Sequence, residues 1–243
     1  MGRPIVIYGK SGSGKSRSLK NFAPEEIQII NVLDKDLPFR NRFTHLLSYN
    51  EYGVIQKAMG IAVQNGIRTI FIDDCGYLMA GKYLDQCAST EKKGNAVFAF
   101  YNSIAHDFWA FVQFIKKLPP DVNVYLAMHE EKAEDGEIRV GCVGKQLAEK
   151  TRIWEWVTIA IRCESEMGEH FFRTRTTGND ITKTPEEMFA LEKIDNDLKA
   201  VDTTIREYYG DNIANQNIAN QNIANQNIAN QNIANQNIAN QGA

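Results

Sequence analysis

A short segment near the start of the chain combines the residue types that bind phosphate groups. It fits the spacing G-x-x-x-x-G-K-[ST] at every fixed position and consists of Gly9, Lys10, Ser11, Gly12, Ser13, Gly14, Lys15 and Ser16. Glycines permit positive φ angles and a close approach of the backbone, so that successive N–H groups form a nest for an anion. The Lys15 ammonium adds charge for the β- and γ-phosphates, and the Ser16 hydroxyl is a ligand for Mg²⁺. The segment predicts a site for ATP with Mg²⁺.

An aspartate later in the chain is the expected partner of this Walker A segment. Residues 69–72 are a run of strand-forming residues, and Asp73 follows directly. A carboxylate at the end of a neighbouring strand holds Mg²⁺ in P-loop proteins, so Asp73 is predicted as a metal contact together with Ser16. For the next residue, Asp74, two interpretations stay open: it orients the attacking water, or it caps the turn.

Two more polar residues after apolar runs are candidates for catalysis. Asp34 follows the run 27–33, at about the place where RecA-like ATPases have a catalytic glutamate, and this similarity makes it the candidate general base, with a solvated turn acid as the alternative. His129 follows the run 122–128 and is predicted to sense the γ-phosphate, because parallel sheets bind ligands at the carboxyl ends of their strands. A structural histidine is the alternative there. Together with Lys15 and Asp73, these residues form the predicted catalytic set.

The elements that must position these residues alternate along the first half of the chain. Strands are predicted at 4–8, 27–33, 69–72 and 122–128, and helices at 15–22, 51–64 and 95–117. This alternation predicts an α/β fold with a mostly parallel sheet and helices on both faces. In the second half, strands at 137–143, 156–163 and 170–176 predict an antiparallel extension, followed by helices at 185–191 and 196–209.

The end of the chain is a repeat that differs from everything before it. From residue 212 to residue 241 the pentapeptide Asn-Ile-Ala-Asn-Gln occurs six times. Isoleucine at every fifth position fits neither the helical period nor the strand period. Residues 211–243 are therefore predicted as a disordered low-complexity tail, with a tether or oligomerisation segment and a β-solenoid as alternatives. Residues 1–210 are predicted as one α/β domain.

The overall composition restricts the partners. The net charge of −3 excludes a strongly basic field over the whole protein, so contacts to nucleic acid must be local. The four cysteines form no CxxC pair and are predicted as reduced thiols. No apolar run reaches the ~18 residues of a membrane span, and no membrane partner is expected. The predicted location is the cytoplasm.

Four motifs in order resemble a family of phage proteins. Between Ile5 and Gly210 the chain contains Ile-Tyr-Gly-x-Ser-Gly-Ser-Gly-Lys-Ser, Phe-Ile-Asp-Asp, Leu-Ala-Met-His-Glu and Ile-Arg-Glu-Tyr-Tyr-Gly. The chain is similar to phage P-loop nucleotide-binding proteins with a RecA-like core, some of which are single-strand annealing ATPases. The resemblance implies an ATP-dependent protein that binds single-stranded DNA and assembles as a homo-oligomer, a ring or filament, in the host cytoplasm if the chain is phage-encoded. It carries over to Gly9, Gly14, Lys15, Ser16, Asp73 and His129.

The chain departs from this family pattern in two places. RecA-like ATPases carry a catalytic glutamate at about the place of Asp34 and Asp36, so the replacement leaves the hydrolysis rate open. The uncharged tail is not expected in the family. Contacts to DNA are predicted at Lys92–Lys93 and at Arg173–Arg175, where cations lie near aromatic residues.

The sequence thus predicts an ATPase that acts on single-stranded DNA in recombination or replication, as an annealing protein or a recombination mediator. Two alternatives stay open. A nucleotide-dependent assembly protein without significant catalysis is favoured by the tail and by the missing glutamate. A small-molecule kinase is the other, although the segment 130–144, with one arginine and several acids, makes a poor phosphate lid.

Overall fold

The computed structural model describes residues 1–87, 95–143 and 152–211 of the chain. The chain divides into two compact units, Met1–Asp202 and Thr203–Ala243. The predicted tail lies, except for Asp211, outside the described residues, and so does the predicted DNA contact at Lys92–Lys93. The sheet and the cavities described below lie in the first unit. No described helix is long and apolar enough to cross a membrane.

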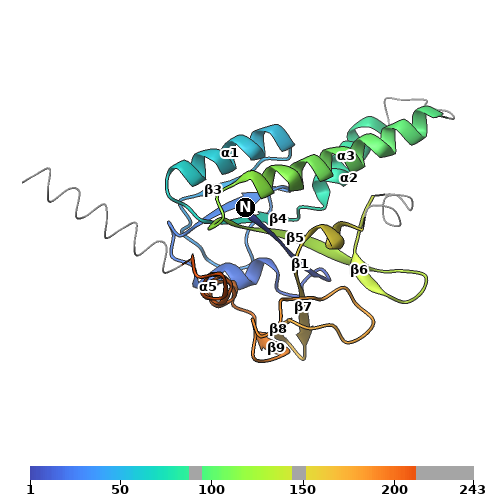
Figure 1. Cartoon of the computed structure of the whole chain (residues 1–243). Coiled ribbons are helices and arrows are strands. Elements are labelled where there is room, and N and C mark those ends of the chain that lie inside the picture. Colours follow the sequence, from blue (N-terminus) through green and yellow to red (C-terminus); the bar gives the residue numbers. More distant parts are fainter. Residues whose placement is uncertain (88–94, 144–151, 212–243) are drawn as a thin grey trace, which may run out of the picture. The chain divides into compact units, whose positions relative to one another are not determined.

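The first unit is built on a sheet of nine described strands (Figure 1). Its order is β3-β2-β4-β5-β1-β7-β8-β9, and β6 pairs with β5. The strands are β1 (Arg3–Gly9), β2 (Ile27–Asn31), β3 (Leu46–Leu47), β4 (Thr69–Asp73), β5 (Asn123–Lys132), β6 (Ile138–Val140), β7 (Ile159–Glu166), β8 (Glu169–Arg173) and β9 (Lys193–Asp195). The neighbours from β3 to β7 are parallel, whereas β6, β8 and β9 pair antiparallel. The predicted α/β fold with a mostly parallel sheet and an antiparallel extension is confirmed.

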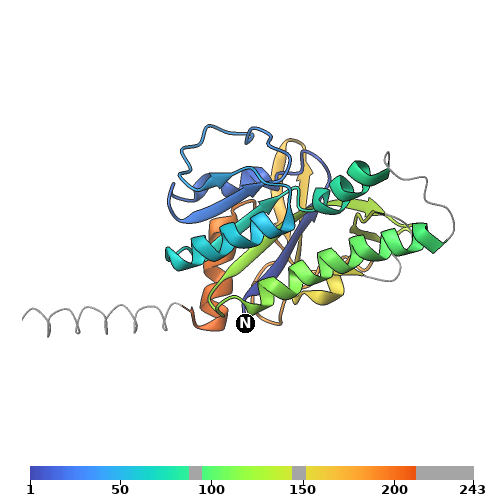
Figure 2. The same cartoon turned by 90° about the horizontal axis from the view of Figure 1, so that it is seen from above.

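Helices cover both faces of this sheet. α1 (Tyr52–Gln64), α2 (Tyr77–Cys87) and α3 (Asn95–Lys117) lie over one face, as Figures 1 and 2 show, and share a buried apolar core with its strands. The 3₁₀ helix η1 (Ser16–Asn21) and the start of α5 (Leu198–Tyr209) belong to the other face. There the carboxylate of Asp202 accepts hydrogen bonds from side chains of β4 and β5, namely Thr69, Asn123 and Tyr125.

Several segments differ from the prediction made from sequence. α2, β3 and β9 were not predicted, and β2 ends at Asn31 rather than at residue 33. The helix after the phosphate loop is 3₁₀ and only six residues long, so it aligns few peptide dipoles behind the loop. The helix predicted at 185–191 is wrong: the segment is a turn, in which Glu187 has a φ of 63°. The strand predicted at 122–128 continues to Lys132, because β6 pairs with the last three residues of β5.

The register of the parallel strands brings their carboxyl ends together. Gly9 at the end of β1 pairs with His129 of β5, and Asn31 at the end of β2 pairs with Asp73 of β4. β5 lies between β1 and β4. The phosphate loop and the polar ends of β4 and β5 therefore meet at one edge of the sheet, where parallel sheets bind ligands.

Candidate functional site

The loop after β1 has a backbone that only its glycines accommodate without strain. Gly12 has a φ of 75° and Gly14 a φ of 107°. A Cβ atom at Gly14 would lie 2.8 Å from Nδ1 of His170, so the loop also packs closely. The N–H groups of Ser11, Gly12 and Gly14 donate no hydrogen bond to any residue that the structure describes. Backbone donors left free in one loop fit an anionic ligand.

The ammonium group of Lys15 is folded back into this loop. Its Nζ donates to the carbonyl oxygens of Gly9 and Lys10, each at 2.9 Å, and the residue is 6% exposed. Burial lowers the pKa of Lys15, although the charges around it, including those of Asp74 and Asp73, oppose the shift. Within the described part of the chain the ammonium contacts only neutral carbonyls. Its charge is therefore available to a phosphate group.

Ser16 and Asp73 present adjoining oxygen atoms. The Ser16 hydroxyl lies 2.8 and 3.0 Å from the two carboxylate oxygens of Asp73. Burial raises the pKa of Asp73, and the hydrogen bond from Ser16 opposes this shift. A divalent cation would compensate a carboxylate that is removed from water in this way. Mg²⁺ is typically held by one or two carboxylates plus substrate phosphates, so the pair fits this ion. No cluster of three or more His, Cys, Asp or Glu that could hold a metal occurs among the described residues.

Asp74 is the second carboxylate at this edge, and two nitrogen donors contact it. Nζ of Lys35 lies 2.7 Å from one carboxylate oxygen, and Nε2 of His129 lies 3.0 Å from the other. Since a carboxylate only accepts hydrogen bonds, Nε2 of His129 carries the hydrogen. Burial, followed by the charge of Lys15, lowers the pKa of His129, which favours a neutral ring at pH 7. Asp74 itself has a φ of 55°, outside the region that most residues adopt.

These groups line a single cavity of about 400 Å³. Its volume lies within the range of small-molecule sites, and it opens at the carboxyl ends of the strands. The predicted residues at its wall are Ser11, Gly12, Gly14, Lys15, Ser16, Asp73 and His129. The structure therefore brings most of the predicted site together.

The other predicted residues lie elsewhere. Gly9 supplies a carbonyl to Lys15, whereas Lys10 and Ser13 line a second cavity. Asp34 is exposed and does not belong to the wall of the 400 Å³ cavity; its carboxylate accepts a hydrogen bond from Ser48. The structure does not bring Asp34 to the phosphate loop, and its predicted role as the base finds no support in this geometry.

Five residues at the cavity were not predicted: Arg17, Lys35, Asp36, Pro38 and His170. Lys35 and Asp36 adjoin the predicted Asp34, so a polar cluster after β2 was a usable signal for them. His170 comes from β8, and nothing in its neighbourhood in the sequence marks it. Its place at the loop depends on the pairing of β7 with β8.

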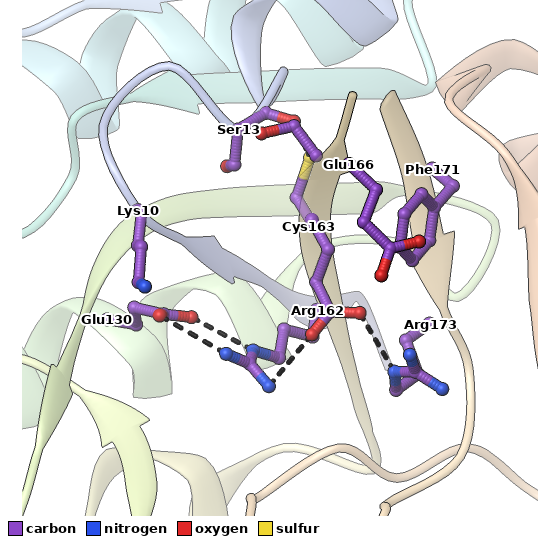
Figure 3. Close-up of a pocket in the computed structure, with 10 residues that line it drawn as sticks. Lys10, Ser13, Glu130, Arg162, Cys163, Glu166, Phe171 and Arg173 are labelled. Atoms are coloured by element: carbon purple, nitrogen blue, oxygen red, sulfur yellow. Dashed lines mark hydrogen bonds and ion pairs between the residues drawn. The ribbon is translucent and has the colours of Figure 1, made fainter. Parts of the chain in front are cut away.

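The second cavity, of about 200 Å³, lies between the phosphate loop and the strands β7 and β8 (Figure 3). A chain of ion pairs crosses it. Arg162 contacts Glu130 at 2.9 Å and Glu164 at 2.9 Å, and Arg173 contacts the same Glu164 at 2.9 Å. These arginines thus have carboxylate partners in their own chain.

Comparison with known proteins gives one family and several distant structures. A family model described as an AAA domain matches residues 1–191. No curated protein matches the chain. A crystal structure of a KaiC-like protein from the hyperthermophilic archaeon Pyrococcus horikoshii OT3 matches with 11% identity over 79% of this chain and 83% of the other, at a TM-score of 0.43. An ATPase from the type III secretion system of pathogenic bacteria matches with 15% identity over 67% of this chain and 52% of the other, at a TM-score of 0.41. At these values neither structure informs on activity.

Proposed function

Because the chain belongs to the AAA domain family, we propose that it binds ATP with Mg²⁺ in the 400 Å³ cavity and hydrolyses the nucleotide. One observation carries the proposal. The same cavity is lined by three kinds of group: the buried Lys15 beside free backbone N–H donors, the adjoining oxygen atoms of Ser16 and Asp73, and the carboxylate of Asp74 with its nitrogen donors. These are the groups that phosphoryl transfer uses for charge, metal and water.

Each side chain has a distinct part in the proposed reaction. Lys15 neutralises phosphate charge, and Ser16 with Asp73 holds the Mg²⁺ ion. The ion supplies stabilisation of the charge on the phosphate oxygens. Asp74 orients the attacking water and accepts its proton, while Lys35 and His129 fix its carboxylate. Asp74 thus replaces Asp34 as the proposed base, because Asp74 lines the cavity and Asp34 does not.

A pair of variants tests this assignment. Asp74→Asn is expected to lower phosphate release about 100-fold, since a positioned general base contributes at least that factor. The dissociation constant of ATP should stay within about threefold of the wild-type value, because Asp74 does not form the nest. Asp34→Asn, the matched control, should hydrolyse ATP as the wild type does. The opposite result, with Asp34→Asn impaired and Asp74→Asn active, contradicts the assignment.

We further propose that the partner is single-stranded DNA and that the protein acts in recombination or replication, as an annealing protein or mediator. The family resemblance motivates this partner, and a loop between β2 and β3 supports it. Its segment 39–43 reads Phe-Arg-Asn-Arg-Phe. The rings of Phe39 and Phe43 meet edge to face at 6.2 Å, and exposed Arg40 and Arg42 form no ion pair with any described residue. Free guanidinium groups beside aromatic rings are what single-strand binding uses.

The same loop adjoins the nucleotide cavity. Lys35, Asp36 and Pro38 precede the aromatic segment by a few residues and line the cavity wall. Nucleotide binding is therefore proposed to act on the position of the loop. The predicted DNA contacts at Arg173 and Arg175 are less suitable, because these arginines bind Glu164 and the carbonyl oxygen of Phe189.

Binding of a labelled oligothymidylate, followed by fluorescence anisotropy, tests the partner. Wild-type protein should bind more tightly with ATP than without it. The double variant Arg40→Ala/Arg42→Ala should bind about tenfold more weakly, with a salt dependence whose logarithmic slope is smaller by about 1.4, the value for two lost phosphate contacts on a single strand. The control Lys116→Ala/Lys117→Ala removes the same charge from the end of α3 and should bind normally. Absence of wild-type binding in every nucleotide state refutes the DNA partner.

An assembly protein without significant catalysis is the second candidate. The observation in its favour is that both carboxylate oxygens of Asp74 already have a nitrogen donor, from Lys35 and from His129, which leaves this group less available to water. Under either function we propose a homo-oligomer, a ring or filament. Light scattering with ATP, ADP or no nucleotide, beside an assay of phosphate release, separates the two. ATP-dependent assembly without any phosphate release identifies the assembly protein.

A further inference from the structure

Two side chains from the β7–β8 hairpin hold one carbonyl group of the phosphate loop. Nδ1 of His170 lies 2.8 Å from the carbonyl oxygen of Ser13, and Sγ of Cys163 lies 3.1 Å from the same atom. Cys163 belongs to β7 and His170 to β8, and the antiparallel register places them near each other by pairing Ser165 with His170. Figure 3 shows Cys163 approaching Ser13 from the strand. Neither residue has a part in the proposed chemistry.

Both contacts are hydrogen bonds donated to the carbonyl. A carbonyl oxygen only accepts, so Nδ1 of His170 carries its hydrogen. Burial raises the pKa of Cys163 to about 11, so the thiol keeps its hydrogen at neutral pH. Nδ2 of Asn196 lies 3.3 Å from Sγ and donates to it, which fixes the thiol from its other side. The Ser13 carbonyl is thus fixed by two donors on neighbouring strands.

The orientation of this carbonyl determines where the next amide points. The peptide between Ser13 and Gly14 is planar, and in the trans form its C=O and N–H groups point in opposite directions. A carbonyl held toward the hairpin directs the Gly14 N–H away from it. Gly14 lines the nucleotide cavity, and its N–H donates to no residue in the described ranges. If this peptide were reversed, a carbonyl oxygen would face the cavity and repel phosphate.

We propose that His170 and Cys163 are positioning residues that hold the Ser13–Gly14 peptide in the orientation that binds a polyphosphate. The inference rests on the proposed nucleotide-binding function and adds residues to it that the phosphate-loop motif does not contain. It also connects the nucleotide site to the hairpin, because any shift of β8 relative to β7 moves one donor away from the Ser13 carbonyl. The nucleotide affinity therefore depends on the conformation of the hairpin.

Calorimetric titration with ATP and with inorganic tripolyphosphate tests the proposal without relying on turnover. His170→Ala should weaken the binding of both ligands by the same factor, about tenfold. The released Ser13–Gly14 peptide would no longer direct the Gly14 N–H at a phosphate oxygen, and a hydrogen bond to a charged group is worth about that factor. His170→Asn keeps an N–H donor near the place of Nδ1 and should return to within about threefold of the wild type. Cys163→Ala should weaken binding, and Cys163→Ser, which keeps a donor, should weaken it less. His106→Ala, on the exposed side of α3, is the control and should bind as the wild type does.

The outcomes distinguish failure of the positioning role from failure of the proposed nucleotide-binding function. Failure of the wild type to bind either ligand overturns both. Wild-type binding that His170→Ala leaves unchanged overturns the positioning role alone. A loss of binding that His170→Asn does not restore, accompanied by a lower midpoint of thermal unfolding in both variants, assigns His170 a purely structural role and also overturns the proposal. Weaker binding at an unchanged midpoint, with rescue by His170→Asn, supports it.

Discussion

Replacement of Lys15 by methionine separates the electrostatic role of this side chain from its volume. In the structure the ammonium is buried and donates to two carbonyl oxygens at 2.9 Å. An ion pair with a phosphate oxygen at about 3 Å is worth about 5 kcal/mol at an effective dielectric constant of about 20. To form this ion pair the Lys15 ammonium gives up its two hydrogen bonds to the carbonyl oxygens, which costs about 3 kcal/mol of binding free energy. The remaining 2 kcal/mol or so corresponds to a dissociation constant for ATP that is about thirtyfold higher in Lys15→Met.

The same replacement should change the stability of the free protein little. Methionine leaves two carbonyl groups without their donor, but it also removes a charge whose burial is unfavourable, as the lowered pKa of Lys15 shows. The free energy of unfolding is expected to stay within about 1 kcal/mol of the wild-type value. Calorimetric titration with ATP and urea unfolding measure the two quantities, and Lys20→Met on the exposed side of η1 is the control. ATP affinity within threefold of the wild type in Lys15→Met would refute the assigned role of the ammonium.

Three further predictions follow from the loop and its carboxylates. Asp73→Asn removes a buried carboxylate with a raised pKa, so the free energy of unfolding of the free protein, measured with urea, should rise by about 1 kcal/mol. In the same variant Mg²⁺ should no longer strengthen ATP binding. A free variant that is less stable than the wild type contradicts the prediction. Gly14→Ala should lower the free energy of unfolding by about 1–3 kcal/mol, because Gly14 has a φ of 107° and a Cβ there would lie 2.8 Å from Nδ1 of His170. The control Gly60→Ala within α1 has open space around the new Cβ and should raise the free energy of unfolding by about 0.5–1 kcal/mol. Equal effects of the two variants in thermal unfolding would contradict this prediction. The pKa of His129 is lowered in the folded protein, so on acidification the unfolded chain takes up this proton first, and the free energy of unfolding should decrease as the pH falls below about 6.5. His129→Gln should show a shallower decrease with pH. An unchanged slope in this variant would contradict the prediction.

The part of the site that follows directly from the sequence is the part made by local patterns. The phosphate loop and Asp73 each follow an uninterrupted apolar strand, so strand, turn and functional residue are read from adjacent positions. His129 was found from the rule that ligands bind at the carboxyl ends of parallel strands, and it contacts the cavity although β5 continues past it. The fold class followed for the same reason, from alternating runs of helical and strand periodicity.

Asp34 lies away from the cavity because β2 is shorter than its apolar run. The run continues to Leu33, but the strand ends at Asn31. The side chain of Asn31 then binds the backbone of Lys35 through both its amide nitrogen and its oxygen, which closes a turn. Within this turn Asp34 adopts a φ of 53° and is exposed, and Lys35 reaches Asp74. Such a turn depends on a side-chain contact over four residues that strand propensity does not contain.

The position of His170 at the phosphate loop could not be predicted from the sequence, for a different reason. It lies 157 residues from Ser13, and only the antiparallel pairing of β7 with β8 brings it to the loop. No pattern near His170 distinguishes it from a surface histidine. Long-range pairing of this kind is set by the whole sheet, so the residues that orient the phosphate loop required the structure.

Equilibrium dialysis of the purified chain against labelled ATP tests the central claim most directly. The cavity formed by the phosphate loop and Asp73 predicts one ATP bound per chain in the presence of Mg²⁺ and a marked loss of binding when a chelator removes the ion. Equal concentrations of ATP on both sides of the membrane, with Mg²⁺ present and the protein folded, would contradict the claim.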